Sequence, residues 1–328
     1  MDRDNLSVDT ENNQLNHLND VFVKFIFFDE ARKKLTLSLI NAFFQAEGTP
    51  SIVDFTFQDR EPDPNSPGGK QPRLDVLGVC SDGTIVEIEF QNLQVEGMAD
   101  RVLFYWARLA QKRSRGVGYA NLPRIACINI LGYKMFPDLP DYHNCYMVIN
   151  TRHAESCLSH RLELHFAEVP KWEEQCRHTR GMDQLSRWLM FFSEKTTPEE
   201  LEELAMQDEM IAQALDAERA FLANEELMSA YEWAEKDRLD REAHQSYWEN
   251  KGREEGFQEG LDEGRKEGHA DGLEEGRKEG HADGFAEGCE RVAKNLISMH
   301  LPDEMIIEAT GLSAEVVASL RSSHAQMQ

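Results

Sequence analysis

The chain has 328 residues, enough for about two ordinary domains with a full-sized core in at least one of them. Its formal net charge of −25 would normally argue against a nucleic-acid partner, but the charge is distributed unevenly. Residues 1–150 carry 15 Lys and Arg against 20 Asp and Glu, whereas residues 151–328 carry 20 against 40. The acidity therefore belongs mostly to the C-terminal half and does not exclude a polyanion site in the N-terminal half.

The cysteines and the apolar runs indicate a soluble protein of the cytoplasm. The six cysteines form no CxxC pair, a pattern that fits free thiols in a reducing compartment better than disulfides or a zinc site. The opening "MDRDNLSVDTENNQ" is polar and acidic, unlike a secretory signal or a transit peptide. No apolar run approaches the roughly 20 residues of a membrane span, so no membrane partner is expected.

The first third of the chain predicts two helices followed by three strands. After a disordered start at 1–17, residues 18–45 place apolar side chains at helical spacing, with an interruption near "FFDEARKK". Residues 51–58 alternate like a strand, and the Pro- and Gly-rich stretch 61–72 predicts an exposed loop. Residues 73–80 and 84–91, joined by a turn at 81–83, predict a hairpin.

The next elements complete an α/β fold class, a mixed sheet flanked by helices. Residues 97–116 predict a helix closed by Gly116, and 124–131, 144–151 and 162–170 predict strands. We expect this α/β domain to span 18–192 and an acidic helical region to follow at 193–250, with a capping box at Thr197 and Glu200. A small C-terminal helical element is expected at 291–328.

Between these regions, the segment 251–290 carries a glycine at every fourth position from 252 to 288. Each glycine in a helix interior costs about 1 kcal/mol relative to alanine, so an isolated helix would be unstable. A glycine stripe also lets two helices approach closely, which favours pairing of two copies. Two interpretations remain open, a flexible acidic linker and a helix that forms a homo-oligomer.

The hairpin carries the residues that suggest chemistry. In "VEIEFQ", Glu87, Glu89 and Gln91 alternate with apolar residues, so their side chains share one face of the strand. Asp75 lies on the preceding strand, close to the position across from Glu89. Two carboxylates with water and a substrate phosphate are a common way to bind Mg²⁺, and Gln91 could orient the attacking water. The alternative is an ordinary solvated face of a strand.

A basic stripe on the helix that follows favours the first interpretation. Helical spacing aligns four cations and a tyrosine: Arg101, Tyr105, Arg108, Lys112 and Arg115. Such a stripe beside an acidic metal site suits a phosphate backbone. The alternative is a solvated amphipathic helix with Leu103, Ala107 and Ala110 facing the core.

Together, "RLDV…VEIEFQ" and "DRVLFYWARLAQK…YANLPRIACINIL" resemble the PD-(D/E)xK nuclease-family transposases, also called recombination-promoting nucleases. The block "NDVFVKFIFFDEARKKLTLSLINAFF" is similar to the N-terminal part of that family, and the resemblance covers about residues 18–290. It implies a restriction-endonuclease-like core that cleaves DNA with Mg²⁺, for which Mn²⁺ could substitute.

By position, the resemblance makes Asp75 and Glu89 the metal ligands and places Gln91 where the superfamily has lysine. Glutamine carries no positive charge, so it can orient water only by hydrogen bonds. The resemblance also suggests Asp20 and Lys24 as supporting residues. It leaves Glu87 either as a third ligand or, the reading we favour, as an exposed residue.

The sequence thus predicts a metal-dependent DNA endonuclease associated with recombination or mobile elements. A second interpretation is a non-catalytic nuclease fold that binds DNA or protein and oligomerises through its acidic tail. RNA is a third possible ligand class, because contacts to a phosphate backbone do not separate it from DNA.

Overall fold

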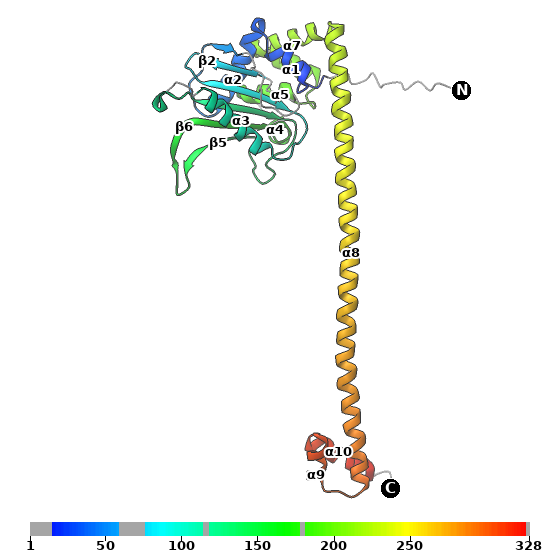
Figure 1. Cartoon of the computed structure of the whole chain (residues 1–328). Coiled ribbons are helices and arrows are strands. Elements are labelled where there is room, and N and C mark those ends of the chain that lie inside the picture. The colour runs from blue at the N-terminus through cyan, green and yellow to red at the C-terminus, as the bar shows by residue number, and fades with distance from the viewer. Residues whose placement is uncertain (1–14, 59–75, 114–117, 178–180, 326–328) are drawn as a thin grey trace, which may run out of the picture. The chain divides into compact units, whose positions relative to one another are not determined.

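The computed structural model describes residues 15–58, 76–113, 118–177 and 181–325. The chain divides into two compact units between residues 243 and 244. The first unit is an α/β domain built on a six-stranded mixed sheet, which confirms the predicted fold class (Figure 1). The predicted loop 61–72, Asp75, Arg115 and Gly116 lie outside the described residues.

The sheet has the order β1-β2-β3-β4-β6-β5. Strands β1, β2 and β3 form an antiparallel meander, β3, β4 and β6 pair in parallel, and β5 returns antiparallel to β6. The strands are β1 (Phe55–Phe57), β2 (Val76–Cys80), β3 (Ile85–Gln91), β4 (Ile125–Leu131), β5 (His143–Asn150) and β6 (His153–Glu168).

The predicted hairpin is confirmed by the pairing of β2 with β3. Val76 faces Ile88, and Leu77 faces Glu87. The turn between the strands uses Gly83 in the left-handed region at φ 85°, which glycine adopts without a steric penalty. The side chain of Asp82 accepts a hydrogen bond from the backbone N–H of Thr84 at 2.9 Å and so fixes the turn.

Helices cover both faces of this sheet, and one face packs against more helices than the other (Figure 1). The helices of the first unit are α1 (Asp20–Phe27), α2 (Lys33–Ala46), α3 (Met98–Arg113), α4 (Val169–Gln175), α5 (Gln184–Phe192), α6 (Pro198–Ala205) and α7 (Glu209–Leu222). The larger core joins the sheet to α1, α2 and α5 through side chains such as Phe27, Phe43 and Trp188. The smaller core joins the other face to α3 through Met98, Val102 and Leu109.

The N-terminal segment is fixed by residues that come more than 170 positions later. The backbone N–H of Asn16 donates to the hydroxyl of Tyr231 at 2.7 Å, and the ring of His17 stacks on Phe191 at 4.3 Å. The side-chain amide of Asn19 donates to Glu235 at 2.7 Å. Leu15, Asn16 and His17, expected to belong to a disordered start, are therefore buried.

Strand β6 is longer than the predicted strand 162–170. Its first half, from His153 to His160, is mostly exposed and pairs with β5 as a ribbon with irregular register. The sequence predicts only the second half as a strand, because that half packs against the cores and needs apolar side chains at alternate positions. The first half is mostly exposed and shows no such alternation.

The carboxylate of Asp208 connects α5 to α7. It accepts from the N–H groups of Met210 and Ile211 at the start of α7, and from the side chains of Gln184 and Arg187 at 2.9 and 3.0 Å. Burial raises the pKa of Asp208, but the hydrogen bonds from Arg187, Gln184 and the helix outweigh it, so the pKa lies below its usual value.

We expect Asp208→Asn to lower the free energy of unfolding by about 1–2 kcal/mol at pH 7. Because the folded-state pKa is depressed, this contribution is present above the unfolded pKa of about 4 and is lost as the pH falls below it. Urea unfolding between pH 3 and 7 measures both effects. The exposed neighbour variant Glu209→Gln is the control, and an equal acid dependence in wild type and Asp208→Asn would contradict the assignment.

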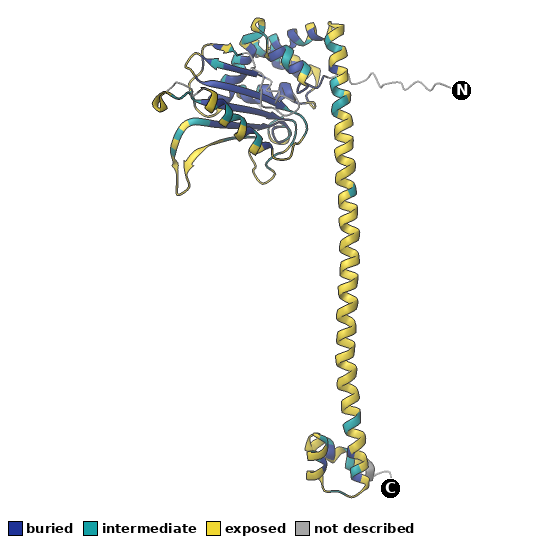
Figure 2. Ribbon diagram, viewed as in Figure 1, coloured by how far each residue is buried: buried dark blue, intermediate teal, exposed yellow. Residues whose placement is uncertain are grey.

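The described part of the second unit is built from helices. Helix α8 (Glu225–Ser298) begins in the first unit and runs through the whole glycine-tetrad segment, which is therefore helical. Most of α8 is exposed (Figure 2). At its end a small core forms with α9 (Asp303–Thr310) and α10 (Ala314–Ala325) around Ala293, Ile306 and Val317. Gly311 ends α9 in the left-handed region at φ 69°, and the helical element expected at 291–328 is present.

Candidate active site

The polar row of β3 is buried beneath α3. Ile85 belongs to the core under α3 and Val86 to the opposite core, so alternation places Glu87, Glu89 and Gln91 on the α3 face. Glu87 is 3% exposed and Glu89 is 6% exposed. The interpretation of this row as a solvated face is therefore wrong, and so is the expectation of an exposed Glu87. Burial of two carboxylates requires specific partners.

Strand β4 supplies polar neighbours that the sequence analysis did not single out. In the parallel register Cys127 pairs with Glu87, and Asn129 pairs with Glu89. The thiol of Cys127 donates to Glu87 Oε2 at 3.2 Å, and the amide of Asn129 donates to the carbonyl of His165 at 3.0 Å. Burial, followed by the charge of Glu87, raises the pKa of Cys127 well above its usual value, so the thiol stays protonated as a donor. The signal that could have pointed to these neighbours is the asparagine inside the otherwise apolar run "IACINIL".

Arg101 of α3 is the cationic partner in the cluster. Its Nη2 forms an ion pair with Glu89 Oε1 and donates to Gln91 Oε1 at 3.0 Å. The amide nitrogen of Gln91 donates to the carbonyl of Leu93 at 2.9 Å, which fixes the orientation of the Gln91 amide. Arg101 therefore points inward and joins the carboxylate of Glu89 to the carbonyl oxygen of Gln91.

The next described members of the basic stripe lie on the same side of α3. Arg101, Tyr105 and Arg108 are partly buried, and Lys112 is exposed. Burial raises the pKa of Tyr105, and the nearby charges of Arg101 and Glu89 act on it in opposite directions. The stripe thus faces the acidic row as well as solvent.

The core-facing side of α3 differs from the predicted one. Met98, Val102 and Leu109 are buried, whereas Leu103 is 47% exposed and Ala107 is also exposed. The expectation that Leu103 and Ala107 face the core is therefore wrong, because the helix turns its cationic side toward the buried carboxylates. Only Ala110 among the three expected residues contacts the core.

Two further predicted residues lie on α1. Lys24 Nζ lies 4.0 Å from Asp20 Oδ2, an i,i+4 pair in which both side chains are at least one-third exposed. Asp75 and Arg115 cannot be placed, as they lie outside the described residues.

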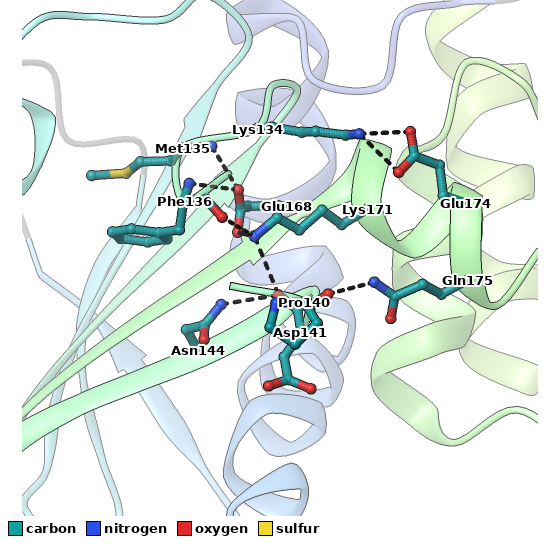
Figure 3. A network of polar contacts seen from close by, with 10 residues as sticks. All are labelled: Lys134, Met135, Phe136, Pro140, Asp141, Asn144, Glu168, Lys171, Glu174 and Gln175. Atoms are coloured by element: carbon teal, nitrogen blue, oxygen red, sulfur yellow. Dashed lines mark hydrogen bonds and ion pairs between the residues drawn. The ribbon is translucent and has the colours of Figure 1, made fainter. Parts of the chain in front are cut away.

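The loop between β4 and β5, which carries Tyr133, is fixed by a buried ion pair between Glu168 and Lys171 (Figure 3). Glu168 is fully buried and accepts from the N–H groups of Met135 and Phe136 at 2.6 and 3.0 Å. Lys171 Nζ lies 2.6 Å from Glu168 Oε2 and also donates to the carbonyl of Phe136. This network fixes the loop that carries Tyr133 toward the cluster.

Tyr133 lies in the electrostatic field of the acidic cluster. Burial raises its pKa to about 12, while the Arg101 cation lowers it and the Glu89 carboxylate raises it. At neutral pH its hydroxyl is therefore protonated. Tyr133 is a further residue that the sequence did not indicate, since nothing in "LGYKMF" separates it from a core aromatic.

The donor set suits a hard divalent cation. Carboxylate oxygens from Glu87 and Glu89 and the amide oxygen of Gln91 share one face, and oxygen donors are the ones that Mg²⁺ prefers. One oxygen of Glu89 pairs with Arg101, so a cation bound there would share the carboxylate with the guanidinium or replace it. The row therefore offers donors of the type that the ion prefers, and Glu89 lies at its middle.

The fold and this cluster define an α/β protein with a buried acidic site beneath a basic helix. Residues 17–247 match the family model of the PD-(D/E)XK nuclease family transposases, and the chain belongs to that family. The match ends before the glycine tetrads, which the resemblance had included. No curated protein and no solved structure matches the chain. Within the described residues, no helix combines the length and apolarity needed to cross a membrane.

Proposed function

We propose that this protein is a metal-dependent DNA endonuclease that acts in recombination or on mobile elements. It hydrolyses phosphodiester bonds with water as the nucleophile. The observation that carries the proposal is the buried row of Glu87, Glu89 and Gln91 in a chain of a nuclease family. A purely structural strand has no need of two buried carboxylates, whose desolvation is costly.

In this proposal Asp75 and Glu89 bind Mg²⁺, and Mn²⁺ substitutes for it. The last described pair of the ladder, Val76 and Ile88, supports this assignment, because Asp75 precedes Val76 in the sequence and Glu89 follows Ile88. When bound, the ion polarises the scissile phosphate and lowers the pKa of the attacking water.

Gln91 orients the water in this proposal. Its amide nitrogen is already bonded to Leu93, so its carbonyl oxygen is the group that faces the site as an acceptor. Arg101 neutralises Glu89 in the metal-free protein and turns toward a phosphate oxygen when DNA binds. Asp20 and Lys24 of α1 remain proposed supporting residues.

DNA binding is proposed along α3. Arg101, Tyr105, Arg108, Lys112 and Arg115 contact the phosphate backbone in this proposal. The partly buried cations beside the acidic row support it, since positive charge placed there attracts the phosphates toward the site despite the overall charge. All six cysteines are free, which supports a reducing compartment such as the cytoplasm.

Plasmid cleavage in Mg²⁺, and separately in Mn²⁺, tests the function. Wild type is expected to cut, whereas Asp75→Ala and Glu89→Ala are each expected to lose at least about 100-fold in rate. Glu96→Ala, an exposed carboxylate beyond the end of β3, is the control. An RNA of matched sequence, tested in parallel, separates the two nucleic acids.

Equal cutting by all four proteins would place the activity outside this site. If the proteins are folded yet inactive with either metal, a second candidate function applies, a binding module that oligomerises. The exposed glycine stripe of α8 favours this candidate, because open space surrounds each of the ten glycines from 252 to 288. Sedimentation equilibrium of the full chain then tests whether two copies pair through residues 251–290.

A further inference from the structure

A second cluster of metal-binding side chains lies on the other face of the sheet from Glu89. In the β5–β6 register Cys145 pairs with His165, and His143 pairs with Ala167, so these side chains share one face. The rings of Phe43 and Phe44 on α2 lie 5.9 and 6.2 Å from the His165 ring, which identifies the face as the one that α2 covers. The cluster is therefore separate from the candidate active site.

Three donor groups converge at this place. Glu47 follows the last residue of α2, and one donor atom from each of Glu47, Cys145 and His165 lies within 4.8 Å of the other two. Cys145 Sγ is 4.0 Å from His165 Nε2. In a tetrahedral zinc site, the bond lengths place such donors roughly 3.4–3.6 Å apart. Side-chain shifts of about 1 Å would bring the three donors to that spacing.

The surroundings of His165 match those of a metal-bound imidazole. His165 is fully buried, and its Nδ1 lies 3.2 Å from Nε2 of His143. The other nitrogen of His143 lies 3.7 Å from Glu47. Imidazoles that bind a metal usually donate their remaining N–H to an acceptor, which fixes the tautomer. Here the neighbouring acceptor is Nε2 of His143. With Nδ1 as the donor, the lone pair of His165 Nε2 points toward Cys145.

Glu163 completes the polar surroundings without joining the donors. Its Oε2 lies 3.6 Å from His165 Nε2, but both of its oxygens accept from Arg124. This bidentate pair commits the carboxylate to the guanidinium. In a tetrahedral site these three donors would leave the fourth position to water.

The donor types identify the ion. Sulfur and imidazole select zinc or a similar transition metal, whereas Mg²⁺ takes oxygen ligands only. We propose that Glu47, Cys145 and His165 bind a zinc ion, with His143 positioning the imidazole of His165. This ion connects the end of α2 to the edge strand β5. The sequence shows no such site, because the ligands are separated by 98 and 20 positions and form no CxxC pair.

Cobalt titration of the tag-free full chain after removal of bound metal tests the proposal. One equivalent of Co²⁺ is expected to give the sulfur-to-cobalt charge-transfer band and the visible bands of a tetrahedral site. The band reports a thiolate ligand, so binding at the acidic site or at exposed histidines does not produce it. Cys145→Ser is expected to lose the band, and Cys157→Ser, on the same ribbon, is expected to keep it.

Competition with a chromogenic chelator then measures zinc affinity. Glu47→Gln and His143→Gln are expected to weaken binding by about 10–100-fold, while the exposed control Glu155→Gln leaves it unchanged. Glu47 is partly exposed, so its variant tests the site even if substitution of Cys145 disturbs folding. A folded wild type without the charge-transfer band, or equal zinc affinity in wild type and Glu47→Gln, would overturn the proposal.

Discussion

Replacing Arg101 by methionine is expected to lower the free energy of unfolding by about 2–4 kcal/mol in the presence of EDTA. The guanidinium is the described cation paired with Glu89, whose side chain is only 8% exposed. Removing one partner of a buried ion pair is strongly destabilising, by about 3–5 kcal/mol when burial is complete. The 27% exposure of Arg101 reduces the expected loss.

Magnesium should recover part of this loss if Glu89 is a metal ligand. At about ten times its Kd, a bound ion stabilises the folded state by about 1.4 kcal/mol. The gain should be larger in Arg101→Met than in wild type, because in wild type the ion competes with the guanidinium for Glu89. It should vanish in Arg101→Met combined with Glu89→Gln.

Guanidinium unfolding with EDTA or with Mg²⁺ measures both effects. The exposed variant Lys112→Met, on the same helix, is the control and should change stability by less than about 0.5 kcal/mol. Equal stabilisation of wild type and Arg101→Met by Mg²⁺ would show that Arg101 and the ion do not share Glu89. That result would count against the proposed active site without any measurement of cleavage.

Lys171→Met is expected to have the larger effect on stability, a loss of about 3–5 kcal/mol. Its partner Glu168 is fully buried, and Lys171 itself is 5% exposed at the side chain. Without the ammonium group, the buried carboxylate of Glu168 loses its cationic partner, and the carbonyl of Phe136 loses its donor (Figure 3). Thermal unfolding of the full chain should show the change in its main transition.

A double substitution separates the charge from the packing. Lys171→Met with Glu168→Gln removes both charges, so it should be more stable than Lys171→Met alone. Lys134→Met is the matched control, because Lys134 belongs to the same loop but pairs with Glu174 at the surface. It should cost less than about 1 kcal/mol. Similar losses in Lys134→Met and Lys171→Met would contradict the role of burial.

The strands of the sheet were predictable where apolar side chains on one face of a strand alternate with polar side chains on the other. The hairpin of β2 and β3 shows this, since period-two alternation and the turn at 81–83 are both written in the sequence. The exposed half of β6 was missed for the opposite reason. Its residues pair only with β5, and pairing without burial leaves no apolar alternation to detect.

The candidate site was predictable in its residue types but not in its environment. Alternation places Glu87, Glu89 and Gln91 on one face, yet only the position of α3 determines whether that face is buried. The inward direction of Arg101 follows from contacts made across 12 positions of sequence, which helical spacing alone cannot show. Cys127 and Tyr133 enter the site through strand order, which depends on parallel pairing between distant segments.

The contacts of the N-terminal segment determine when the first unit can finish folding during synthesis. Asn16 and Asn19 bind Tyr231 and Glu235, so the emerging chain cannot close its larger core until about residue 235 has left the ribosome. The strands that carry Glu89 and Asn129 are made long before that point. Closing a loop of this length costs entropy that only the completed core repays. The nascent polypeptide therefore holds the β3 carboxylates in a domain that is not fully folded until translation is well past them.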